Sequence, residues 1–136
     1  MKVNMTVFKI FSTTAVLGSI LLLSGCSTSS TPSSLSFGTN VNKNSQNLTV
    51  SGTQYSPNAN IYLRVFDSQP FGNTKLIFLL EKQDGSGWTQ VDQENFSVNP
   101  NDDVEVMPFY VTATGTYQVT ILNGNQTIAS NQFTAQ

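Results

Sequence analysis

The segment Gly115-Thr116-Tyr117-Gln118-Val119-Thr120-Ile121, close to the C-terminal end, decides the fold of this chain. Tyr117, Val119 and Ile121 alternate with polar residues, which is the period of a β-strand that buries one face. Asn123-Gly124 follows shortly afterwards, and this pair tolerates the positive φ angles of a tight hairpin turn. The sequence therefore predicts an antiparallel pair of strands at the end of the chain.

Six other short apolar segments lie along the chain, with Gly, Pro, Asn and Asp between them. Together the predicted strands are Leu48 to Val50, Ile61 to Phe66, Leu76 to Leu80, Trp88 to Val91, Val104 to Val111, Tyr117 to Leu122 and Ile128 to Phe133. Short strands at this spacing are typical of a β-sandwich, and no segment has a sustained helical period. We therefore expect one all-β domain over residues 37–136, an antiparallel β-sandwich of about seven strands.

Two positions do not fit simple alternation. Ile128 and Phe133 have opposite parity along one predicted strand, so both can face the core only with a bulge near Ser130-Asn131 or a strand end there. Pro108 has no N–H group to donate to a neighbouring strand, which predicts that it lies on an edge strand or at a bulge.

The turn Gly115-Thr116-Tyr117 and the alternating strand after it resemble the late strands of immunoglobulin-like domains. The resemblance implies a tyrosine corner, in which the Tyr117 hydroxyl bonds to backbone across the turn. The cysteine pair that joins the two sheets of antibody domains is absent, and Trp88 has no cysteine to pack against. The chain thus resembles a looser bacterial immunoglobulin-like sandwich. The likeness covers residues 37–136 as a pattern and carries over no functional residue.

Leu23-Ser24-Gly25-Cys26 stands at the end of an apolar N-terminal segment and contains the only cysteine of the chain. Lys2 and Lys9 precede the most apolar part of that segment, as the cationic residues of a signal peptide do. The four residues resemble the lipobox of bacterial lipoproteins. The resemblance implies that the Cys26 thiol receives a diacylglyceryl group, and that a peptidase recognising Leu23, Ser24 and Gly25 then cleaves before Cys26.

Two other interpretations of the N-terminal segment agree less well with its residues. An uncleaved membrane anchor needs about 20 predominantly apolar residues, whereas Lys9 and Ser12-Thr13-Thr14 interrupt this segment. An ordinary signal peptide favours a cleavage site of the A-x-A type, which differs from the sequence before Cys26. We therefore expect a lipoprotein signal peptide at 1–25, a lipidated cysteine with a short disordered Ser/Thr-rich tether at 26–36, and the sandwich after it.

Charge limits the partners of the mature chain. The formal net charge is −2 and becomes −4 after cleavage, because residues 1–25 contain Lys2 and Lys9 but no acid. The other basic residues are isolated, so we expect no nucleic-acid partner and no electrostatic attraction to lipid headgroups. Contact with membrane lipid comes from acylated Cys26, since two acyl chains anchor a protein stably. The expected location is the cell envelope, on the extracytoplasmic side of a membrane.

The absence of histidine and of a second cysteine limits catalytic and metal chemistry. Asp92 and Glu94 lie two residues apart on a probable strand, and a glycosidase could use such a pair; a solvated strand face is the simpler interpretation. Asn99 to Glu105 is rich in the oxygen ligands that calcium prefers, although Asn-Pro and Asn-Asp pairs are ordinary turn formers. We expect no enzyme activity, no metal site and no cofactor.

Three classes of function remain. The first is a non-enzymatic, membrane-anchored binding or accessory module whose partner is another envelope protein. The second is a module for peptidoglycan or carbohydrate, which would stack sugar rings on exposed aromatic side chains among Tyr55, Tyr62, Trp88 and Tyr110. The third is a small enzyme or protease inhibitor, which would need a persistent cleft or an ordered protruding loop.

The unbroken apolar run from Leu76 to Leu80 indicates where a partner could bind. In a two-layer sandwich each strand buries one face. We expect Phe78 to point into the core and Ile77 and Leu79 to remain outside, as a possible interaction surface. A contiguous outer apolar patch commonly marks an interface, and coverage by the segment 67–74 is the alternative.

Overall fold

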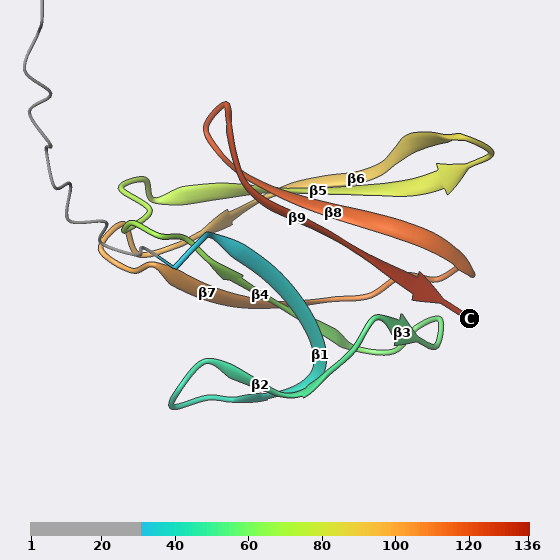
Figure 1. The fold of residues 1–136 in the computed structure, drawn as a ribbon, viewed down its shortest axis with the longest axis horizontal. Helices are drawn as coiled ribbons and strands as arrows, with labels where there is room; N and C mark the ends of the chain where they lie inside the picture. Colours follow the sequence, from blue (N-terminus) through green and yellow to red (C-terminus); the bar gives the residue numbers. More distant parts are fainter. Residues whose placement is uncertain (1–30) are drawn as a thin grey trace, which may run out of the picture.

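A computed structural model describes residues 31–136 as two packed β-sheets (Figure 1). Its nine strands are β1 (Ser34–Asn42), β2 (Asn47–Ser51), β3 (Gln54–Tyr55), β4 (Ile61–Phe66), β5 (Lys75–Asp84), β6 (Gly87–Ser97), β7 (Val104–Phe109), β8 (Gly115–Asn123) and β9 (Gln126–Ala135). One sheet has the order β2-β1-β4-β7, and the other has the order β3-β9-β8-β5-β6. All pairs are antiparallel except β3 with β9. Within 31–136 no helix is long and apolar enough to cross a membrane.

The predicted all-β sandwich is confirmed, with nine strands where about seven were expected. The seven predicted segments correspond to β2 and to β4 through β9, and the two that were missed are β1 and β3. β1 starts at Ser34 and pairs there with Phe66. The tether expected at 26–36 therefore extends too far, because residues 34–36 belong to the sandwich.

Alternating residues of both sheets form the core. Ile61, Leu63 and Val65 on β4 have no exposed surface, and neither do Val119 and Ile121 on β8. These strands lie inside their sheets, so each can direct every second side chain toward the other layer.

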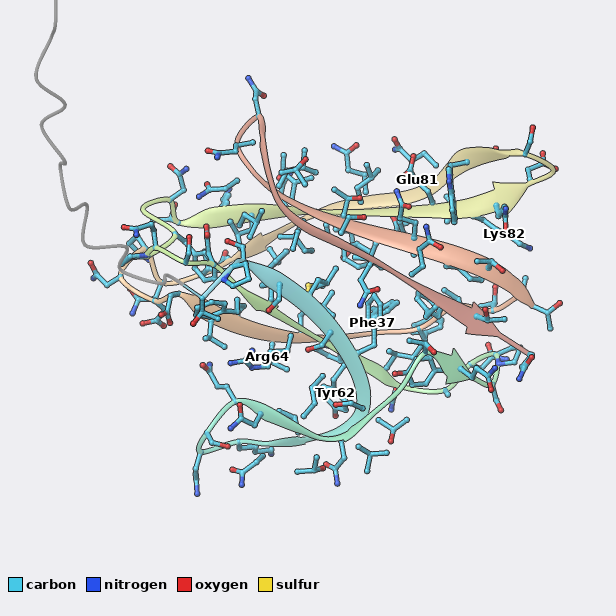
Figure 2. The ribbon with its side chains drawn as sticks, viewed as in Figure 1. Phe37, Tyr62, Arg64, Glu81 and Lys82 are labelled. Carbon is cyan, nitrogen blue, oxygen red and sulfur yellow. The ribbon has the colours of Figure 1, made fainter. Side chains whose placement is uncertain are left out.

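Four phenylalanines connect the two layers. Phe37 and Phe109 come from the four-stranded sheet, and Phe78 and Phe133 come from the five-stranded sheet. Ring centroids lie 5.2 Å apart for Phe37 and Phe133, and 5.4 Å apart for Phe78 and Phe109. Figure 2 places Phe37 between the layers. Such pairs contribute about 0.5–1.5 kcal/mol each beyond the burial of their area.

The β1–β2 hairpin covers part of the outer face of the four-stranded sheet. Tyr62 and Arg64 project from β4 toward this hairpin (Figure 2). The Nε atom of Arg64 donates a hydrogen bond to the carbonyl oxygen of Gln46, at 3.0 Å, in the turn of the hairpin. The hairpin therefore does not cover the outer face of the five-stranded sheet, which lies on the other side of the sandwich.

Both irregular positions behave as the sequence requires. The register between β8 and β9 shifts where Ile121 pairs with Ala129 and Leu122 pairs with Thr127, which leaves Ile128 as an extra residue. The predicted bulge therefore exists, two residues before Ser130, and both Ile128 and Phe133 reach the core. Pro108 lies on β7, an edge strand of its sheet.

The tyrosine corner is present. The Tyr117 hydroxyl donates a 2.7 Å hydrogen bond to the carbonyl oxygen of Ala113, four residues earlier. The Tyr117 side chain is 3% exposed, and its ring stacks on Phe133 with centroids 5.3 Å apart and planes 12° apart. The bond fixes the turn into β8 while the ring fills the core.

Tyr117→Phe should remove this bond and keep the ring. We expect a loss of about 0.5–1.5 kcal/mol in the free energy of unfolding, measured by urea denaturation at neutral pH. Tyr110→Phe is the matched control, because Tyr110 is 62% exposed. Equal stabilities of wild type and Tyr117→Phe would show that the corner contributes nothing.

The same variant should change the response to alkaline pH. Burial raises the pKa of Tyr117 above its ordinary value of 10.0. The unfolded chain therefore loses this proton at lower pH than the folded chain, so stability declines as the pH rises above about 10 and through the raised pKa. In Tyr117→Phe the free energy of unfolding should decline less steeply over that range. Some decline should remain, because burial also raises the pKa of Tyr55.

Candidate functional site

The sandwich is open along the edge formed by β6 and β7. β6 pairs only with β5, and β7 pairs only with β4. Two hollows of about 390 and 330 Å³ lie along this edge. They share Leu80, Asp92 and Tyr110 among their lining residues, so they form one continuous groove. We call it the edge groove.

The register of β6 against β5 determines which side chains form one wall of the groove. Asp92 lies opposite Leu80, and Glu94 lies opposite Phe78. Leu80 and Phe78 are buried core residues. Directly opposed residues of neighbouring strands share a face of the sheet, so both carboxylates lie on its inner face. The predicted pairing of Asp92 and Glu94 on one side of a strand is confirmed.

A bulge in β6 adjoins these carboxylates. Leu80 pairs with Asp92 while Glu81 pairs with Gln90, which leaves Val91 as an extra residue. Bulges bend an edge strand and redirect its side chains. Val91 is 50% exposed and lines the edge groove.

The remaining walls of the groove combine apolar and aromatic groups with one cation. Tyr110, directly after β7, is 62% exposed, and Met107 and Phe109 line the hollow beside it. At the other end the Lys82 Nζ lies 5.7 Å from the centroid of the Tyr117 ring. The groove therefore has an apolar floor with two carboxylates on one wall.

The edge groove combines ionisable side chains with apolar ones. Its ionisable side chains are Asp92, Glu94, Lys82 and two tyrosines, and the chain contains no histidine that could act as a base. Within the described residues, no group of three or more acidic, histidine or cysteine side chains could hold a metal ion. Apolar floor and exposed carboxylates together suit a partner that has apolar and basic groups.

The interaction surface predicted at Ile77 and Leu79 lies elsewhere, on the outer face of the five-stranded sheet. Both side chains are half-buried, whereas Leu76, Phe78 and Leu80 are buried in the core. Leu122 on β8 lies opposite Ile77 and extends the apolar row. Glu81 continues the same face of β5, on the outside of the sandwich in Figure 2.

The segment 67–74 is directed toward the end of the sandwich. The Phe71 N–H donates to the carbonyl oxygen of Asp102 at 2.9 Å, and the Gly72 N–H donates to that of Pro100 at 2.8 Å. The Phe71 side chain is buried in the core. These contacts tie the segment to the turn before β7, and Ile77 and Leu79 keep part of their surface exposed.

The oxygen-rich segment from Asn99 to Glu105 forms this turn. The Asn99 side-chain oxygen accepts a hydrogen bond from the Asn101 N–H at 3.1 Å, and Asn99 Nδ2 donates to an Asp102 carboxylate oxygen at 3.2 Å. Further carbonyl oxygens accept bonds from 67–72. Several oxygens of this segment thus hold the turn together, which favours the turn over a calcium site.

The aromatic side chains considered for sugar stacking are dispersed. Tyr55 is buried, Tyr62 and Trp88 are half-buried, and Tyr110 is exposed. Tyr62 projects from β4 toward the β1–β2 hairpin (Figure 2). A platform of two or more exposed rings is therefore not formed by these four residues.

The lipobox residues Leu23, Ser24, Gly25 and Cys26 lie outside the residues that the structure describes. Comparison with known proteins adds no assignment. No family model matches this chain, and no curated protein matches it. Function must therefore be inferred from the lipobox motif and from the geometry of the sandwich.

Sequence reasoning identified single members of the edge groove and missed the groove itself. Asp92 and Glu94 are candidates for a glycosidase pair and Tyr110 for sugar stacking, while nothing in the sequence marks Val91 or Lys82 as a site residue. No local signal marks the groove, because Val91 followed by Asp92 fits the ordinary alternation of a strand with one buried face.

Proposed function

We propose that this chain is a membrane-anchored extracytoplasmic lipoprotein of the cell envelope that acts as a non-enzymatic binding or accessory module for another envelope protein. The observation that carries the proposal is Leu23-Ser24-Gly25-Cys26 after an apolar segment, with no other cysteine in the chain. β1 starts eight residues after Cys26. Acylation would therefore hold the sandwich close to the membrane surface.

The edge groove supports a protein partner. Val91 and Tyr110 are two of the three large hydrophobic residues that are exposed within 31–136, the third being Val50. Exposed apolar side chains that gather in one place commonly mark an interaction site. A module for peptidoglycan or carbohydrate is less well supported, because Tyr110 is the single exposed ring among the four considered. A small enzyme or protease inhibitor has the weakest support.

Processing of the precursor tests the anchor. Cys26→Ser should abolish incorporation of labelled palmitate and leave unprocessed precursor, because the peptidase acts on the lipid-modified cysteine. Globomycin, which blocks that peptidase, should cause an uncleaved precursor of the native protein to accumulate, and this precursor should carry the diacylglyceryl group that the serine variant lacks. Mass spectrometry of the protein from membrane and soluble fractions measures both effects.

Ser30→Ala, outside the four-residue motif, is the control and should be acylated and cleaved normally. Mature soluble protein with an unmodified Cys26 thiol in untreated cells would contradict the anchor. Cross-linking the lipidated protein in its own membranes, followed by mass spectrometry, then tests the partner. Recovery of one envelope protein in stoichiometric amount is the expected result, and exclusive retention on purified peptidoglycan would favour the carbohydrate alternative.

A further inference from the structure

We propose that the edge groove binds an extended strand of a protein partner, with a basic side chain of that strand turned toward Asp92 and Glu94. The inference deepens the proposed function, because it specifies the chemistry of the partner. Three properties of the groove carry it: a free strand edge, inward carboxylates on that edge, and exposed apolar residues beside them.

The free edge provides main-chain hydrogen bonds. β6 is eleven residues long and has β5 as its only neighbour in the sheet. Its outer edge therefore presents N–H and C=O groups that another strand can pair with. The bulge at Val91 interrupts the register, so the regular part of this edge runs from Asp92 to Ser97.

The carboxylates determine which strand can pair there. An added strand would place side chains directly opposite Asp92 and Glu94 on the inner face. A second copy of β6, paired antiparallel so that Asp92 lies opposite Glu94, would bring like charges together across the new ladder, and such pairs are destabilising. A strand with lysine or arginine at these positions would neutralise both acids instead. The edge therefore disfavours self-association and favours a basic partner.

Inward charges on an edge strand can also serve only to prevent aggregation. Two features distinguish a binding edge from a merely protected one. Val91 and Tyr110 are both exposed in the groove, where a protected edge would present polar side chains. The hollow of about 390 Å³ also reaches the core residue Leu80, which gives an apolar side chain of the partner a place to bind.

Peptide binding to the full chain, as purified from its membranes in detergent, tests the inference at physiological ionic strength, where contacts between distant exposed charges are screened. The probes are two acetylated and amidated seven-residue peptides, one of alternating valine and lysine and one of alternating valine and glutamate. Fluorescence anisotropy should show at least tenfold tighter binding of the lysine peptide. Hydrogen exchange should show slower exchange of backbone amides within 92–97 when that peptide is bound.

The double variant Asp92→Asn with Glu94→Gln should lose most of the preference for lysine. The matched control is Glu81→Gln with Asp84→Asn, which removes the same charge from β5 outside the groove and should keep the preference. Both double variants should retain the wild-type melting midpoint, because all four side chains lie outside the buried core.

Equal binding of the two peptides, equal losses in both double variants, or protection of amides outside 92–97 would overturn the inference. Dimerisation of the wild type through β6 would overturn it as well. These measurements do not depend on how the precursor is processed. Their failure would leave the lipoprotein proposal standing, and failure of acylation at Cys26 would leave the peptide result standing.

Discussion

Phe78→Asp should unfold the sandwich. Phe78 is 2% exposed on β5, between β6 and β8, and its ring contacts Phe109 across the layers. Removing a buried phenyl ring costs about 3–5 kcal/mol, and an unpaired buried carboxylate adds further to that cost. A domain of this kind has about 5–15 kcal/mol of stability in total. Circular dichroism and urea titration at 25 °C should therefore find little or no folded protein.

Leu79→Asp is the matched control, one residue further along the same strand. Leu79 is half-buried on the outer face, opposite Gln93 and Thr120. A charge there can reach water, so the melting midpoint should change little, while capture of a partner through this face would weaken. If Leu79→Asp unfolds the domain as Phe78→Asp does, both faces of β5 are covered and the outer surface at Ile77 and Leu79 is not an interface.

Gly38→Ala should push strands β1 and β2 apart and thereby destabilise the domain. A Cβ atom at Gly38 would overlap the carbonyl oxygen of Val50 and lie 3.2 Å from the Leu48 Cβ. The first of these atoms is backbone, so the strands must move apart to relieve the overlap. Overpacking of this kind costs about 1–3 kcal/mol. The free energy of unfolding from urea titration measures it.

Gly52→Ala is the control for the same hairpin. The nearest atom to a Cβ at Gly52 is the Tyr55 hydroxyl, at 3.8 Å, which is an ordinary contact. Both substitutions reduce the freedom of the unfolded chain similarly, so the difference between them isolates the overlap at Gly38. A difference below about 0.5 kcal/mol would show that the hairpin adjusts without cost and that Gly38 is replaceable.

The missed strands show what local pattern cannot detect. β1 reads Ser34-Leu35-Ser36-Phe37-Gly38-Thr39-Asn40-Val41-Asn42, where few apolar residues stand among serine, glycine and asparagine. This composition continues that of the Ser/Thr-rich segment before it. Its strand geometry comes from pairing with β4 and from burial of Leu35 and Phe37. β3 has two residues, too few for any period.

The bulge in β9 and the edge position of Pro108 are features that the local sequence did predict. Parity alone required a bulge or a strand end near Ser130-Asn131 if Ile128 and Phe133 both face the core, and Pro108 alone required an edge or a bulge. Sequence could not locate the bulge at Ile128, because its place depends on the register with β8. Asn131 illustrates the reason: it occupies a position opposite the buried Val119, and its side chain donates to the Leu35 carbonyl oxygen at 2.8 Å on the neighbouring sheet.

The sequence by itself determined the positions of strands β4 to β9, the alternation along β8, the turn at Asn123-Gly124 and the tyrosine corner at Tyr117, because each depends on residues close together in the chain. The tertiary structure alone decided which edge stays open. Val91 and Tyr110 meet there because β5 pairs with β8 and β4 pairs with β7, across long separations in sequence. The face on which Asp92 and Glu94 lie was decided by the register of β6 against β5, since a shift of one residue would turn both carboxylates outward.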